Sequence, residues 1–432
     1  LYLALDKTEP MFTHFLEAQL KEKKITHGDI SFVLNLDNTD KEWSDENTEN
    51  RSYAYDCQIT EADNVCLNGY FHVLDKVMVT PSNMAEVIRT NGSTNLFSSM
   101  LERFSAPYYD ATLTQEYKAL HNIAADSVFQ KLYISQRSQI GAITLDPDGE
   151  TLGDYPSLAY DPGWNTYSVN NSTKEQDMAA MFVPSDEAMR EYFVNGGGKM
   201  LIERDGTRPN TYENLQFNLF QIPLNIVKPL IANLMKESFN ESVPSKYLTI
   251  MNDAQDQMFS AETYKTIDEY KALFDKVLMA NNGVVYVMNR VIGPATYSSV
   301  MAPVLYNEGT QVMNRVIHAD DNFTTTNYQN APLRKFYSTY LLAMQSNFTL
   351  FVPTDEGLKN YGMIDPMSLS AARKTNYRFW TFQPEEVKAS GGKRLAVRAE
   401  AYAFDQKTPL NESTGGTPKQ TVSADIDLDT EW

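Results

Sequence analysis

The sequence predicts an α+β protein built from tandem copies of one domain. Two motifs predict this, because each occurs twice and they alternate along the chain. The first motif reads FVPSDEAM at 182–189 and FVPTDEGL at 351–358. The second reads FHVLDKVMVTP at 71–81 and VYVMNRVIGPA at 285–295. Two motifs that recur in alternation indicate repeated domains.

The first motif predicts a strand that ends abruptly and is followed by a helix. Phe182 is an apolar strand residue, and Pro184 ends the strand because it has no N–H to donate to a ladder. Ser185 is a good helix N-cap, and Asp186 places negative charge in the first helical turn, where the helix dipole favours it. The second copy keeps this pattern. Its corresponding residues are Phe351, Pro353, Thr354 and Asp355.

The second motif predicts a strand. Alternate side chains face opposite sides, so that Phe71, Val73 and Asp75 share one face and His72 lies on the other. A proline closes each copy, at 81 and at 294. We interpret both motifs as folding signals, and we expect His72 to be packed and hydrogen-bonded.

Together these residues resemble the fasciclin-like domain family, which carries two boxes of this kind in this order. Residues 348–356, FTLFVPTDE, are similar to the first box, and residues 71–78, FHVLDKVM, to the second, including His72 and Asp75. The copy at 285–292 departs from the pattern at Tyr286 and Asn289. The resemblance implies a β-wedge or sandwich with packed helices. It also implies a non-enzymatic protein that is extracellular or surface-anchored and works by adhesion.

The order of the motifs gives a domain map. Residues 1–81 are expected to be the C-terminal part of a first fasciclin-like domain, since they hold only the second motif. Residues 82–295 hold both motifs and are expected to be a complete domain with an insert at about 105–178. Residues 296–432 hold only the first motif and are expected to be a third domain lacking its C-terminal strand. We expect the chain to be a fragment that begins and ends inside domains.

Helical spacing of apolar residues follows the first proline. It runs from Met84 to Phe104, with Asn91-Gly92 as a break, and predicts two helices. The insert that follows is longer than a compact domain needs and is rich in turn residues, and loops of this length are often functional. It carries the candidate ligand-binding residues, which are Tyr155, Tyr160, Trp164 and Tyr167. Such rings bind sugars or partner proteins. The alternative is that they form a small satellite core.

The two cysteines, Cys57 and Cys66, lie nine residues apart. A disulfide between them is possible in an exported protein, and two free thiols are the alternative. The net charge of −19 argues against nucleic acid binding, because phosphate contacts need a basic surface. No apolar run reaches the length of a membrane span.

Catalytic motifs are not evident. The five histidines are scattered, and neither a metal-binding pair nor a nucleophile elbow is present in the sequence. We therefore expect no enzyme activity, no cofactor and no metal site. The expected function is adhesion to a surface or matrix protein. The alternatives are an accessory polysaccharide-binding lipoprotein that supports glycan uptake, and a structural spacer. The expected location is the cell surface, with an anchor in the outer membrane of a bacterium.

Overall fold

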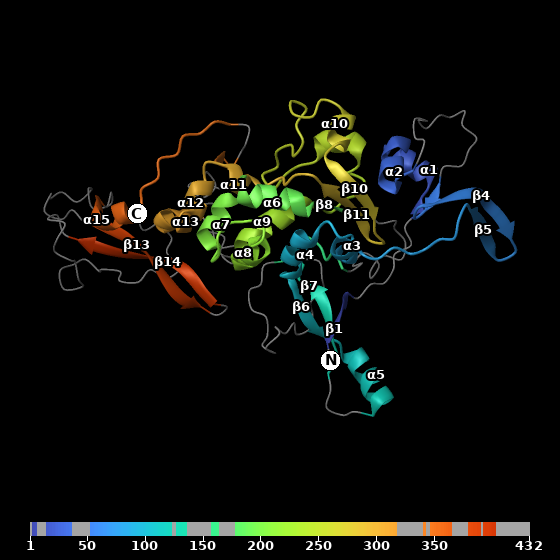
Figure 1. Ribbon diagram of the computed structural model, residues 1–432, viewed down its shortest axis with the longest axis horizontal. Helices are drawn as coiled ribbons and strands as arrows, with labels where there is room; N and C mark the ends of the chain where they lie inside the picture. The colour runs from blue at the N-terminus through green and yellow to red at the C-terminus, as the bar shows by residue number, and fades with distance from the viewer. Residues whose placement is uncertain are drawn as a thin grey trace, which may run out of the picture. The chain divides into compact units, whose positions relative to one another are not determined.

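The computed structural model describes residues 2–6, 14–36, 52–122, 127–135, 157–163, 178–317, 340–342, 346–364, 379–389 and 392–402. The chain divides into two compact units, 1–293 and 294–432, each of which is described by itself. The division falls two residues before the predicted boundary at 295, and residues 1–81 share a unit with residues 82–293. Helices and strands both occur, so the mixed α+β class is confirmed (Figure 1).

The first unit contains most of the described elements. Its strands are β1 (Tyr2–Asp6), β2 (His14–Phe15), β3 (Tyr53–Ala54), β4 (Cys57–Cys66), β5 (Gly69–Leu74), β6 (Ser105–Tyr109), β7 (Phe129–Tyr133), β8 (Ala179–Pro184), β9 (Met235–Lys236), β10 (Phe274–Met279) and β11 (Gly283–Met288). Its helices are α1 (Glu17–Glu22), α2 (His27–Leu34), α3 (Met84–Thr90), α4 (Asn95–Glu102), α5 (Ala111–His121), α6 (Asp186–Val194), α7 (Lys199–Asp205), α8 (Leu215–Gln221), α9 (Leu224–Leu234), the 3-10 helix η2 (Pro244–Thr249) and α10 (Ile267–Lys271).

The centre of the first unit is a four-stranded sheet in the order β10-β11-β8-β9. Strand β8 carries the first motif and β11 the second, and the two run parallel with Phe182 opposite Tyr286. Every residue of both strands is buried, as is usual for parallel strands covered on both faces. The two motifs, about a hundred residues apart in sequence, are therefore neighbouring strands.

Aromatic rings fill the space beside this sheet. The ring of Phe182 stacks on that of Tyr286 with centroids 5.2 Å apart, and Phe274 lies 5.3 Å from Tyr286. Phe259 and Tyr270 extend the cluster, with their centroids 4.9 Å apart. Burial raises the pKa values of both the Tyr270 and Tyr286 hydroxyls, because the low-dielectric core disfavours phenolate.

Local capping signals are confirmed in the first motif. The Ser185 side chain accepts the backbone N–H of Ala188 and caps α6, and β8 ends at Pro184 as predicted. The predicted break between two helices also forms, separating α3 from α4. Gly92 lies in it with φ of 79°, a left-handed conformation that costs a glycine little.

Residues from the start of the chain pack against the central sheet. The Asn35 side-chain amide donates to Val277 O of β10 at 2.8 Å. The buried Asp29 carboxylate accepts from the backbone N–H and the hydroxyl of Ser245, at 2.7 and 2.6 Å. The rings of Phe32 on α2 and Phe274 lie edge to face at 6.0 Å. These contacts explain why residues 14–36 belong to the same unit as the central sheet.

The second unit contains a long hairpin and short helices. Its elements are α11 (Ala295–Ser298), α12 (Ala302–Tyr306), the 3-10 helix η3 (Glu308–Thr310), α13 (Gln311–Ile317), α15 (Asp355–Asn360), β12 (Met363–Ile364), β13 (Phe379–Ala389) and β14 (Gly392–Tyr402). Helices α13 and α15 and strands β13 and β14 contribute one buried side chain each to a small hydrophobic cluster, which consists of Val312, Leu358, Phe382 and Val397.

The second copy of the first motif folds only in part as predicted. Thr354 caps α15 by accepting the backbone N–H of Gly357 at 3.1 Å, as expected. The predicted strand before it is not formed: residues 349–353 are in neither a helix nor a strand. Strand β8 is held by a ladder on each side, whereas no described strand pairs with residues 349–353. Phe351 is consequently 89% exposed, although the corresponding Phe182 is fully buried.

Each unit nevertheless contains, within itself, the same kind of contact between the first motif and a helix N-terminus. Asp186 accepts the backbone N–H of Leu96 at the start of α4, and Asp355 accepts the N–H groups of Gln311 and Val312 at the start of α13. Just before each helix, a threonine hydroxyl donates to the carbonyl six residues earlier. These pairs are Thr94 to Ile88 and Thr310 to Val304. Helix α13 thus corresponds to α4.

Candidate interaction surface

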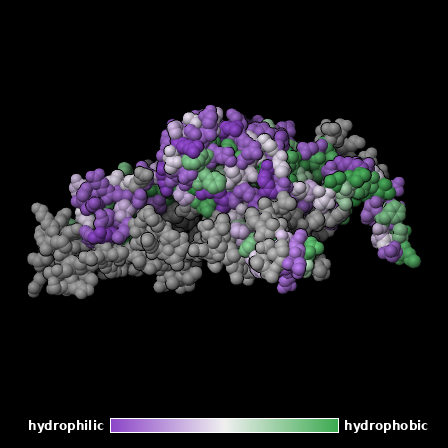
Figure 2. Space-filling model, turned by 60° about the horizontal axis from the view of Figure 1, so that its bottom comes forward, coloured by the Kyte–Doolittle hydropathy of each residue, from purple (hydrophilic) through white to green (hydrophobic). Residues whose placement is uncertain are grey.

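The β4–β5 hairpin presents apolar side chains to solvent on both of its faces. Strand β5 lies at the end of the sheet β2-β3-β4-β5, and no other described strand pairs with its outer edge. Figure 2 shows hydrophobic side chains gathered along this ribbon. The exposed apolar residues of the ribbon and of the chain that follows it are Val65, Leu67, Tyr70, Phe71, Val73, Val77 and Val79. Several exposed apolar side chains beside an open strand edge are typical of a protein interaction site.

The base of this hairpin matches the base of the β10–β11 hairpin, although β4 has a second irregularity, between Glu61 and Asn64, that β10 lacks. Both have a β-bulge in the first strand, between Ile59 and Glu61 in one and between Phe274 and Lys276 in the other. Each bulge lies opposite two residues of the second motif, Val73-Leu74 in β5 and Val287-Met288 in β11. These are corresponding positions of the two copies. The structure therefore equates β5 with β11.

A hydrogen bond just after each strand supports the same alignment. The backbone N–H of Asp75 donates to Gln58 O at 3.0 Å, and that of Asn289 donates to Leu273 O at 2.9 Å. Asp75 and Asn289 are corresponding residues of the second motif. The outer edge of β5 is accordingly the one that β8 covers on β11.

The backbone direction along β5 follows from its contacts with β4. Asp75 N–H donates to β4, and Val73 O accepts from the Thr60 hydroxyl of β4 at 3.2 Å. Backbone groups of successive strand residues point to opposite edges, so those of His72 and Leu74 point to the open edge. In β11 the carbonyl of Met288, which corresponds to Leu74, accepts the N–H of Ser185 at 2.8 Å.

The base of the hairpin is polar. Lys76 Nζ lies 2.6 Å from Asp56 Oδ2, and Asp75 Oδ1 accepts the backbone N–H of Gln58 at 2.8 Å. The hydrogen bond from Lys76 lowers the pKa of the Asp56 carboxyl and raises that of the Lys76 ammonium. The Nδ1 atom of His72 accepts a hydrogen bond from the backbone N–H of Asp63 at 3.2 Å. His72 is hydrogen-bonded as expected, but it is exposed rather than packed.

The possible disulfide between Cys57 and Cys66 is not formed. Both thiols are free, Cys57 buried and Cys66 exposed. They stand at opposite ends of the ten-residue strand β4, which separates them by about 30 Å at ~3.3 Å per residue. A disulfide needs Cα atoms within about 7 Å, so the extended strand excludes it. Burial raises the pKa of the Cys57 thiol, and the adjacent Asp56 carboxylate adds to this effect.

The aromatic insert behaves differently from the ligand-binding prediction where the structure describes it. Tyr160 is buried, and its hydroxyl donates to Ala180 O of β8 at 2.8 Å. The neighbouring Pro162 carbonyl accepts from Ala85 N–H and the Asn282 amide, so the segment is fastened to the central sheet. Tyr160 thus packs as part of the core and presents no ring to a surface ligand. Tyr155, Trp164 and Tyr167 lie outside the described residues.

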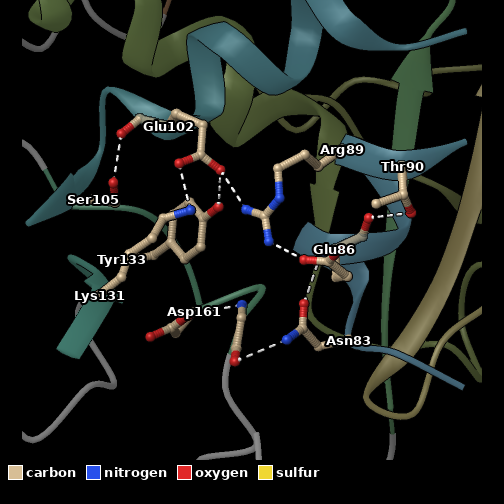
Figure 3. Close-up of polar contacts among 10 residues, drawn as sticks. Asn83, Glu86, Arg89, Thr90, Glu102, Ser105, Lys131, Tyr133 and Asp161 are labelled. Atoms are coloured by element: carbon tan, nitrogen blue, oxygen red, sulfur yellow. Dashed lines mark hydrogen bonds and ion pairs between the residues drawn. The ribbon is translucent and has the colours of Figure 1, made fainter. Parts of the chain in front are cut away.

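A charged network that the sequence reasoning missed lies between α3, α4 and β7 (Figure 3). Glu102 accepts from Arg89 at 3.0 Å and from the Tyr133 hydroxyl at 2.5 Å, and it pairs with the buried Lys131. Arg89 also pairs with Glu86 one turn away. The four charges cancel, and they join β7, which follows α5, to the helices. We interpret this network as structural.

Among the described residues, no three His, Cys, Asp or Glu side chains come together as metal ligands do. None of the described helices has the length and apolar character that crossing a bilayer requires. Comparison with protein-family models, with curated proteins and with solved structures found no match to this chain.

Proposed function

We propose that this chain is a non-enzymatic binding protein of tandem fasciclin-like domains, and that it holds other protein chains through the β4–β5 hairpin. The observation that carries the proposal is the open edge of β5, flanked by exposed apolar side chains such as Phe71 and Tyr70. An unpaired strand edge offers backbone donors and acceptors to an added strand, while neighbouring side chains supply the buried area.

The fasciclin-like reading is supported by two relationships. The two box-like motifs pair as parallel central strands in β8 and β11. The first acidic residue of the first box binds the start of another helix in both units, through Asp186 and Asp355. The same resemblance supports a place at the cell surface, anchored in a bacterial outer membrane, where adhesion to a surface or matrix protein is the expected activity.

Binding of the full chain to immobilised collagen, fibronectin and a glycan array tests this proposal. The informative variant is Tyr70→Ser/Phe71→Ser, and Leu120→Ser, an exposed apolar residue on α5, is the matched control. Protein binding that the hairpin variant loses and the control keeps would support the proposal. Binding to glycans alone, unchanged in the hairpin variant, would favour the polysaccharide-binding alternative. Failure to bind any of these probes would favour the structural spacer.

A further inference from the structure

The two motifs pair with each other in the centre of the first unit, as β8 and β11. Each motif also occurs in a second copy, which pairs with no described copy of the other motif. Strand β5 carries the second motif and has an open edge, although the corresponding β11 is covered by β8. Residues 349–353 carry the first motif, and no described strand pairs with them, although the corresponding β8 lies between two strands. The protein therefore presents two complementary halves of one strand pair.

The exposed side chains on the two halves match the residues that contact each other in the formed pair. Phe182 stacks on Tyr286 at 5.2 Å, and both rings are fully buried. Their counterparts, Phe351 and His72, are both exposed. An exposed phenylalanine ring leaves its favourable burial energy unrealised. Pairing the two halves would recover part of it.

We propose that copies of this chain associate by strand addition, with residues 349–353 of one copy lying parallel to β5 of another. This inference rests on the proposed function, since it names the partner at the same surface. The β8–β11 register places His72 opposite Phe351 and Val73 opposite Val352. The carbonyl of Leu74 then accepts the N–H of Thr354, as that of Met288 accepts the N–H of Ser185.

The contact joins two different surfaces of the chain. Such a heterologous contact leaves one free edge and one free segment on every pair unless a ring closes. The assembly therefore grows as the protein concentration rises. Of the exposed charges at the hairpin base, Lys76 and Asp56 are paired with each other, and the Asp75 carboxylate accepts the backbone N–H of Gln58 within the hairpin.

The first test is a proline in β5. His72→Pro removes a backbone N–H that points to the open edge and leaves the β4 ladder intact, and an edge position tolerates proline. His72→Ala keeps that N–H and is the matched control. Light scattering of the full chain should show a mass that rises with concentration in the wild type and in His72→Ala, and a monomer in His72→Pro. A wild-type monomer at every concentration would overturn the inference.

Cysteine cross-linking tests the register. In a Cys66→Ser background, the full chain with His72→Cys is mixed with the full chain carrying Phe351→Cys, and mild oxidation should give the mixed disulfide dimer. Phe71→Cys replaces His72→Cys in the control, because a one-residue shift puts the thiol on the other face of the strand. Equal cross-linking of Phe71→Cys and His72→Cys would contradict the proposed register. A further chain carries both His72→Cys and Phe351→Cys. If its disulfide forms mainly within one chain rather than between two chains, a second copy is not the occupant of the β5 edge.

The two proposals fail separately. If His72→Pro and the wild type are both monomers yet the hairpin still mediates binding to matrix protein, the partner is a different protein and only this inference fails. If the chain self-associates through β5 but binds no matrix protein, the adhesion proposal fails and the strand addition stands.

Discussion

The carboxylate of Asp186 accepts the backbone N–H of Leu96 at 2.7 Å, although the two residues lie 90 positions apart. The same carboxylate accepts from the Asn95 side-chain amide at 2.9 Å. The sequence motif predicts a negative charge at the N-terminus of its own helix, α6, where the helix dipole favours it. The structure adds a second role, because Asp186 also binds the N-terminus of α4 and thereby fixes that helix against the first motif.

Replacing Asp186 by alanine should loosen the start of α4. The substitution removes an acceptor of two hydrogen bonds from a helix N-terminus, so we expect a loss of about 2 kcal/mol. Hydrogen exchange of residues 95–102 measures it as faster exchange than in the wild type. Glu187→Ala is the control, since Glu187 is an exposed carboxylate of the same helical turn that pairs with Arg190 at 3.6 Å. Equal exchange in both variants would contradict this role of Asp186.

Glu102 should be the sensitive residue of the charged network. Glu102→Gln leaves the ammonium of Lys131, which is buried, without its carboxylate, so we expect a loss of about 3 kcal/mol in the free energy of unfolding. Adding Lys131→Met should recover part of that loss, because the buried charge is removed as well. Urea denaturation measures both.

Glu203→Gln provides the control for this network. Glu203 pairs with Lys199 at 3.5 Å on the exposed side of α7, and exposed pairs contribute little. We expect a change of less than about 0.5 kcal/mol. If Glu102→Gln were equally mild, or if Lys131→Met added to its cost, the network would not stabilise the fold as argued.

Local signals in the sequence predicted local structure well. Ser185 and Thr354 cap helices, Pro184 ends a strand, and Asn91-Gly92 separates two helices, because each effect depends on a few adjacent residues. The sequence did not predict the contact of Asp186 with Leu96 or the network around Glu102. Those contacts join residues far apart in the chain, and charged residues of this kind are usually solvated.

The unpaired copies show a different limit of sequence reasoning. The letters FVP form a buried strand at 182–184 and no strand at 351–353. A strand is stabilised by hydrogen bonds to neighbouring strands, and those strands lie outside the motif, so the motif alone does not predict whether they are present. Likewise, Phe71 lies in the same alternating pattern as a buried strand, yet it is 53% exposed, because no other described strand covers the outer edge of β5. Tyr160 was expected in a binding loop, and only its fixed position against Ala180 reveals a core residue.

The two thiols should differ sharply in reactivity. Cys66 is exposed, whereas Cys57 is buried and its thiol pKa is raised, so that less of it is the reactive thiolate at neutral pH. We expect a maleimide to label Cys66 in the native protein and Cys57 only after denaturation. Mass spectrometry of labelled peptides measures this. Labelling of both thiols at similar rates in the native protein would contradict the burial of Cys57.

Lys236 should make stability depend on pH in the alkaline range. Burial lowers the pKa of its ammonium to about 8 from an ordinary value of 10.5, and Nζ donates to Met251 O at 2.7 Å. Between these two pH values the unfolded chain binds a proton that the folded chain has released. The contribution of Lys236 to stability therefore rises with pH from about 8 to about 10, by at most about 1.4 kcal/mol per pH unit. Below pH 8 both states are protonated, and the contribution is constant.

Comparing the wild type with Lys236→Met isolates this contribution, because methionine does not titrate. Free energies of unfolding from urea denaturation at several pH values should diverge above pH 8, with the wild type gaining stability relative to the variant. Lys199→Met is the control, since its side chain is half exposed on α7 and should give a curve parallel to that of the wild type. Parallel curves for Lys236→Met would show that the ammonium of Lys236 stays hydrated in the folded state, and that burial does not lower its pKa.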